Sequence, residues 1–214
     1  MRLRHLPALG LSVASALAVV AFAPKAHAED AEQFIQREHA TLERMLHQPP
    51  SPARDAEVNQ ALDSFVDYDE LTRRAFGEPC HPTLPNCEDI WVTYEGAKQQ
   101  EVHDLLKHLV EKSYRKNLLK TLDYDINYRG TREQGGDIRV ITEAQNKARP
   151  RDPPTRVDYI VKQTPSGFRV VDIVTEGSSL TKNYYDQFRK KMHNPSEGYP
   201  NIVMKLREKI AKKE

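Results

Sequence analysis

One stretch of the chain, residues 168–188, combines the pattern of a buried strand with that of a helix covering a sheet. In its first part, FRVVDIVT, apolar residues occupy both alternating faces, which is typical of a central strand covered on two sides. Gly177 permits a positive φ, and the serines after it can cap a helix. Leu180, Tyr184 and Phe188 then recur at four-residue spacing, which predicts a helix that faces back onto the sheet.

Three further strand signals precede this stretch. Residues 122–128 and 157–162 alternate apolar and polar side chains, and residues 137–147 have an apolar centre. Residues 131–136 contain two adjacent glycines and are predicted to form the first turn. Short connections of this kind join neighbouring antiparallel strands, so the sequence predicts a four-stranded antiparallel meander.

Amphipathic helical patterns lie on both sides of these strands. The predicted helices span residues 31–46, a segment capped by Asp55, residues 70–76, 90–119 and 180–192, and a last segment from Ile202. This order predicts an α+β fold in which helices pack on one face of a curved four-stranded antiparallel sheet.

The first 28 residues have the pattern of a secretory signal peptide. Arg2 and Arg4 precede an apolar run over residues 9–22, and Ala26-His27-Ala28 forms a small-x-small cleavage site. The run is short for a membrane span, which disfavours the alternative of an uncleaved anchor. We therefore expect export, cleavage after Ala28, and a single domain over residues 29–214.

The net charge and the two cysteines argue against nucleic-acid binding, redox catalysis and a metal site. Without residues 1–28 the chain has 29 Lys and Arg against 31 acidic residues, a net charge of −2, which is not the charge of a nucleic-acid-binding protein. Cys80 and Cys87 are separated by HPTLPN and are predicted to form a structural disulfide in an exported protein. A redox-active pair would need C-x-x-C, and a metal site at His81 lacks further ligands.

Catalytic motifs are missing from the sequence. It has no G-x-S-x-G, no P-loop and no H-E-x-x-H. His103 and His108 lie about 140° apart around one predicted helix and cannot share a metal ion. Asp172 interrupts an apolar strand and is the best isolated candidate for a buried general base, although a lone acid is weak evidence for catalysis. We expect no enzyme.

The segment VVDIVTEGSSLTKNYYDQF, residues 170–188, resembles the strand–helix signature of the MlaC-type (toluene-tolerance) family of periplasmic phospholipid-binding proteins. The residues at matching places are Asp172, Glu176, Gly177, Ser179, Leu180, Asn183, Tyr184, Gln187 and Phe188. VDYDELTRRAFG, residues 66–77, resembles a helix of the same family, and the order and spacing of the two matches fit a single resemblance over most of the chain after the first 28 residues. The resemblance implies that Asp172 is structural and bonds backbone groups or Asn183.

The resemblance implies a periplasmic lipid carrier. Such proteins shuttle phospholipid between an outer-membrane lipoprotein complex and an inner-membrane ABC transporter complex, which maintains the lipid asymmetry of the outer membrane. We expect a monomer with no cofactor, whose cargo is a phospholipid. A carrier of another lipid, such as a hopanoid, and a non-catalytic periplasmic interaction module are the alternatives.

A soluble carrier has to enclose the lipid tails, because each acyl CH₂ moved out of water contributes about 0.8 kcal/mol. We predict a cavity between sheet and helices, walled by Phe65, Phe76, Leu106, Val110, Tyr114, Leu118, Val140, Tyr159, Val161, Val171, Ile173, Leu180 and Tyr184. The sequence does not show which strand face looks inward, so part of this set is expected to be ordinary core. An enzyme or small-ligand binder of similar shape would need a small polar pocket with converging titratable groups instead.

Overall fold

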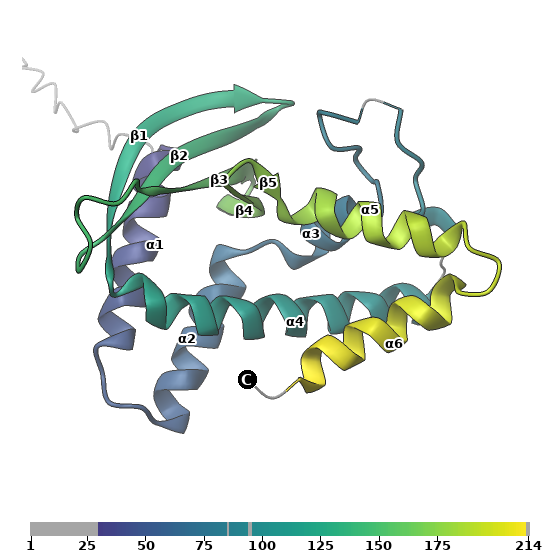
Figure 1. The fold of residues 1–214 in the computed structure, drawn as a ribbon, viewed down its shortest axis with the longest axis horizontal. Coiled ribbons are helices and arrows are strands. Elements are labelled where there is room, and N and C mark those ends of the chain that lie inside the picture. The colour runs from purple at the N-terminus through teal and green to yellow at the C-terminus, as the bar shows by residue number, and fades with distance from the viewer. Residues whose placement is uncertain (1–29, 85, 94–95, 213–214) are drawn as a thin grey trace, which may run out of the picture.

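The structure, a computed structural model, describes residues 30–84, 86–93 and 96–212, and for residues 114–121 only the backbone. The predicted signal peptide, residues 1–28, lies outside the described residues. Helices and strands follow one another in three blocks, with helices first, then the sheet, then helices again. The predicted α+β class is confirmed, and Figure 1 shows α1, α2 and α4 on one side of the curved sheet.

The first block contains four helices. They are α1 (Ala31–Leu46), α2 (Pro52–Phe65), α3 (Tyr68–Ala75) and α4 (Ala97–Thr121), with the 3₁₀ turn η1 (Trp91–Thr93) before α4. Side-chain caps fix where the first three begin. Asp30 and Gln33 form a reciprocal capping box on α1, and Asp67 caps α3.

Four predicted helix starts were wrong, since α3 begins two residues before residue 70, the last helix begins at Gly198 and not at Ile202, and α2 and α4 also begin elsewhere. Ser51 caps α2, and Pro52, in the first turn, has no amide hydrogen to leave unpaired, so this helix begins ahead of Asp55. The long helix begins at Ala97 and not at Ile90, because the Asp89 carboxylate accepts a hydrogen bond from the backbone N–H of Trp91 and holds a separate turn there.

The sheet has five strands, not the predicted four. They are β1 (Tyr124–Gln134), β2 (Asp137–Asn146), β3 (Thr155–Thr164), β4 (Gly167–Thr175) and β5 (Ser178–Ser179), all antiparallel and in sequence order. The fifth strand forms because Glu176 and Gly177 both have positive φ, which makes a two-residue turn. The predicted turn over residues 131–136 is shorter than expected, because β1 continues to Gln134.

Cross-strand pairing defines the face of the sheet that meets the helices. Tyr159 of β3 pairs with Val140 of β2 and with Ile173 of β4, and these side chains pack with the helices in one hydrophobic core. A bulge then interrupts β3–β4 pairing, and Val171 lies in a second cluster with Ile160 and Val174. The main core therefore lies between the helices and one face of the sheet.

Asp172, on β4, fastens the last strand and the start of α5 (Leu180–Met192) to the sheet. Its buried carboxylate accepts hydrogen bonds from the Ser179 hydroxyl at 2.6 Å and from the backbone N–H of Thr181 at 3.0 Å. The expected bond from Asp172 to backbone is thus confirmed, whereas Asn183 bonds the Ser178 hydroxyl instead. These bonds explain why an acid interrupts an apolar strand.

A buried ion-pair network fastens α3 to the sheet. Glu70, 1% exposed, lies 2.8 Å from Arg74 and 3.0 Å from Lys162 of β3. Arg74 also reaches Asp137 of β2 at 2.7 Å. Since a buried charge left without its partner is costly, these contacts fix the position of α3 against β2 and β3.

The C-terminal helices pack against helices of the first block. α5 packs against α3, and α6 (Gly198–Ala211) packs against α4, as Figure 1 shows. The predicted disulfide is confirmed: Cys80 and Cys87 are bonded, with Cα atoms 5.7 Å apart. Over the described residues, every helix is too short or too polar to cross a membrane.

Candidate functional site

Six ring-bearing side chains form an aromatic cluster between α1, α2 and the sheet. They are Phe34, His39, Phe65, Tyr128, Tyr159 and Phe168, with neighbouring ring centroids 5.0–6.3 Å apart. Such distances are those of favourable offset or edge-on ring contacts. The cluster joins residues more than a hundred positions apart in the chain and forms part of the main core.

The helix and strand periodicities bring this cluster together. His39 follows Ile35 by four positions and precedes Leu42 by three, so it lies on the buried face of α1. Tyr128 alternates with exposed residues of β1 and meets His39, whose Nδ1 lies 2.8 Å from the tyrosine hydroxyl oxygen. This hydrogen bond joins α1 to the edge strand of the sheet.

Burial keeps both partners of this hydrogen bond neutral. Desolvation lowers the pKa of His39 from 6.5 to about 4, and burial raises the pKa of Tyr128 above its usual value. As a whole residue, His39 nevertheless keeps part of its surface accessible. It therefore lies at the edge of the packed core and not at its centre.

The structure brings ten of the thirteen predicted wall residues to one core. Phe65, Phe76, Leu106, Val110, Val140, Tyr159 and Val161 are buried in it, and Ile173, Leu180 and Tyr184 are partly buried against it. Val171 lies in the second cluster and is not brought together with them. The side chains of Tyr114 and Leu118 lie outside the described residues.

Phe76 and Tyr184 belong to a second group of rings, on α3 and α5. The rings of Phe76 and Phe188 are stacked with centroids 4.6 Å apart, and Tyr184 lies 5.5 Å from Phe188. The buried residues of α5 are Thr181, Tyr185 and Phe188. The predicted four-residue stripe is therefore fully buried only at Phe188, while Leu180 and Tyr184 are partly buried against the core, because α5 packs on α3 as well as on the sheet.

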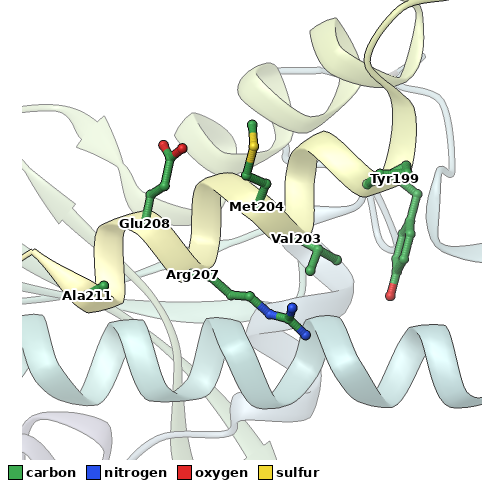
Figure 2. Close-up of a pocket in the computed structure, with 7 residues that line it drawn as sticks. Tyr199, Val203, Met204, Arg207, Glu208 and Ala211 are labelled. Atoms are coloured by element: carbon green, nitrogen blue, oxygen red, sulfur yellow. The ribbon is translucent and has the colours of Figure 1, made fainter.

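Two open surface depressions lie away from the aromatic cluster. One, of about 580 Å³, runs along α6 and is lined by Tyr199, Pro200, Val203, Met204, Arg207, Glu208 and Ala211. Figure 2 shows Arg207 reaching toward α4, where it meets Glu101 at 2.6 Å, while Met204 and Glu208 point away. The other, of about 430 Å³, lies beside the proline-rich connection at residues 149–154. Both are open to solvent.

Sequence reasoning left four members of the aromatic cluster out of the predicted wall. Phe34, Tyr128 and Phe168 stand in apolar positions of predicted elements, but each is separated from its ring partners by a long stretch of chain. His39 has the spacing of a core residue on α1, and that spacing was the available signal. Among the described residues, no group of three or more metal-ligating side chains comes together.

The depressed pKa of His39 predicts a loss of stability in mild acid. The folded protein favours the neutral ring, so the stability it contributes is present above the unfolded pKa of 6.5 and is lost as the pH falls toward about 4. The full loss from this group is about 3 kcal/mol. Urea unfolding at pH 7 and at pH 4.5 should show a smaller loss for His39→Phe than for the wild type. His47→Phe, on the exposed end of the same helix, is the control, and equal losses in all three proteins would contradict the assignment.

A search among solved structures finds the same fold. The phospholipid-binding protein from Ralstonia solanacearum, solved in complex with a phospholipid, superposes with a TM-score of 0.69 at 21% sequence identity. The match covers 86% of this chain and 98% of that chain. No curated protein matches the chain. The family model described as MlaC protein matches residues 32–208, and by this match over most of its length the chain belongs to the MlaC family.

Proposed function

We infer that this protein binds a phospholipid and carries it through the periplasm. Membership of the MlaC family and the shared fold of the phospholipid-binding protein from Ralstonia solanacearum support this function. The observation that carries the proposal is the interior next to the aromatic cluster. It consists of apolar and aromatic side chains, and His39 at its edge is desolvated but only partly buried.

Such an interior suits lipid tails. Each enclosed CH₂ contributes about 0.8 kcal/mol, so two acyl chains need a long apolar wall and few polar groups. The proposed wall combines Phe65, Leu106, Val110, Val140, Tyr159, Val161 and Ile173 with Phe34 and Phe168 of the aromatic cluster. Val171 is left out of it, because it lies in the second cluster.

The role we assign is that of a carrier without catalysis. The cargo passes between an outer-membrane lipoprotein complex and an inner-membrane ABC transporter complex, and this transfer helps to maintain outer-membrane lipid asymmetry. Residues 1–28 direct export and are cleaved after Ala28, and the mature domain acts as a monomer without a cofactor. The family match supports this assignment, and the −2 charge of the mature chain is suited to a protein that does not bind nucleic acid.

Native mass spectrometry tests the binding step. The protein is exported in a bacterial host, purified without detergent, and measured intact, and its organic extract is then analysed for lipids. We expect one diacyl phospholipid for each chain. A ligand-free mass that stays unchanged after incubation with phospholipid vesicles would defeat the proposal and favour an interaction module.

A further inference from the structure

The hydrogen-bonded pair of His39 and Tyr128 has two polar hydrogens, and only one of them is used in the bond between the two side chains. The neutral imidazole has one N–H and the neutral phenol has one O–H, yet only one hydrogen can lie between His39 Nδ1 and the Tyr128 oxygen, 2.8 Å apart. If the tyrosine donates, the spare hydrogen is on His39 Nε2. If the histidine donates, it is on the tyrosine oxygen. Neither side chain has another hydrogen-bond partner within the part of the chain that the structure describes.

The pair is not fully enclosed by the core. His39 and Tyr128 are both partly buried, so each residue keeps part of its surface accessible. The rings of Phe65 and Tyr159 and their apolar neighbours surround His39.

We propose that the His39–Tyr128 pair is a polar anchor that donates a hydrogen bond to an ester carbonyl oxygen of the bound lipid. The proposal rests on the function inferred above. A diacyl phospholipid has two such carbonyls between its charged head and its tails, so a donor at the wall of an apolar interior can reach one while the tails are enclosed. A ligand that covers the donor without supplying an acceptor leaves it unpaired, which weakens binding.

The charges near the pair favour a neutral acceptor over the lipid phosphate. In the part of the chain whose side chains the structure describes, the acidic groups that act electrostatically on Tyr128 are Glu32 and Glu43 on α1. Negative charge on this side opposes an anionic phosphate and leaves a carbonyl unaffected. The anchor therefore distinguishes how the acyl chains are linked to glycerol, and it does not distinguish between head groups.

Two phospholipids with the same head group and chain lengths, one with ester and one with ether linkages, test this role. Ether linkages have no carbonyl. The wild-type protein, freed of lipid, is expected to prefer the ester lipid by about tenfold in a competition read by native mass spectrometry. The double variant His39→Phe/Tyr128→Phe keeps both rings and removes both donors, so its preference should fall to about one while it still binds the ether lipid.

A second readout needs the wild type alone. The infrared band of a ¹³C-labelled ester carbonyl is expected at a lower frequency in the complex than in an apolar solvent, because the carbonyl accepts a hydrogen bond. Equal binding of the two lipids by the wild type, an unshifted band, or a preference that survives in the double variant would each overturn the anchor. Binding of neither lipid would overturn the proposed function itself.

Discussion

Replacing Gly77 with alanine is expected to destabilise the protein by about 3–5 kcal/mol. Gly77 follows α3 with φ at +91°, a conformation that side chains strain. A Cβ there would lie 2.3 Å from the carbonyl oxygen of Glu88 and 2.8 Å from Cε2 of Tyr185. Neither neighbour can move freely, because the backbone N–H of Glu88 donates a hydrogen bond to the Tyr185 hydroxyl at 2.8 Å.

Gly130 provides a matched control for this substitution. It has φ at +95°, but a Cβ there would meet nothing within 4 Å. Gly130→Ala should therefore show only the backbone cost of about 1–2 kcal/mol. Urea unfolding of both variants separates the backbone cost of a positive φ from the cost of the steric clash at Gly77. If Gly77→Ala and Gly130→Ala lose the same stability, close packing at Gly77 contributes nothing.

Replacing Asp172 with alanine should cost about 4 kcal/mol of unfolding free energy, because hydrogen bonds to a charged group are strong and their buried donors would be left unpaired. The carboxylate accepts from the Ser179 hydroxyl, from Thr181 N–H and, at 2.9 Å, from the N–H of Ile173. Since two of these donors start α5, we expect the helix to lose its anchorage to β4 first. Hydrogen exchange at the amides of α5 should report this loss alongside urea unfolding.

Asp186→Ala is the control for the Asp172 substitution. Asp186 lies on α5 itself, but it is half exposed, and its ion-pair partner among the described residues is Lys182, four positions earlier, at 2.6 Å. Pairs of this kind contribute about 0.3–0.5 kcal/mol. A comparable loss in the two variants would mean that Asp172 does not have the anchoring role assigned to it.

Elements with strong local signals were predictable from the sequence. The bounds of α1 and α5 match the predicted residues 31–46 and 180–192, because an amphipathic pattern coincides there with capping side chains. The start of α4 was not predictable from its periodicity, since residues 90–93 continue the apolar pattern while the Asp89 side chain bonds the backbone at Trp91. A two-residue strand such as β5 is too short to have any period.

The candidate site was predictable only in part, because wall and core are built from the same residue types. Val171 was placed in the wall by its apolar character, but a bulge between β3 and β4 shifts the alternation and turns it to the second cluster. His39 had no distinguishing sequence feature. Its meeting with Tyr128, 89 positions later, depends on how α1 crosses the edge of the sheet.

The contact between the end of α2 and β4 has a consequence for the order of folding. Val66 forms a parallel bridge with Val170, and the N–H of Asp67 donates to the carbonyl of Val170 at 2.9 Å. The intervening segment contains α3, α4 and the first three strands, which can pair locally as hairpins. Closing so long a loop loses entropy before any contact compensates for it, which makes such contacts slow. The end of α2 therefore gains its partner on β4 only once nearly the whole chain is present, and a nascent or truncated chain that ends before β4 lacks this contact.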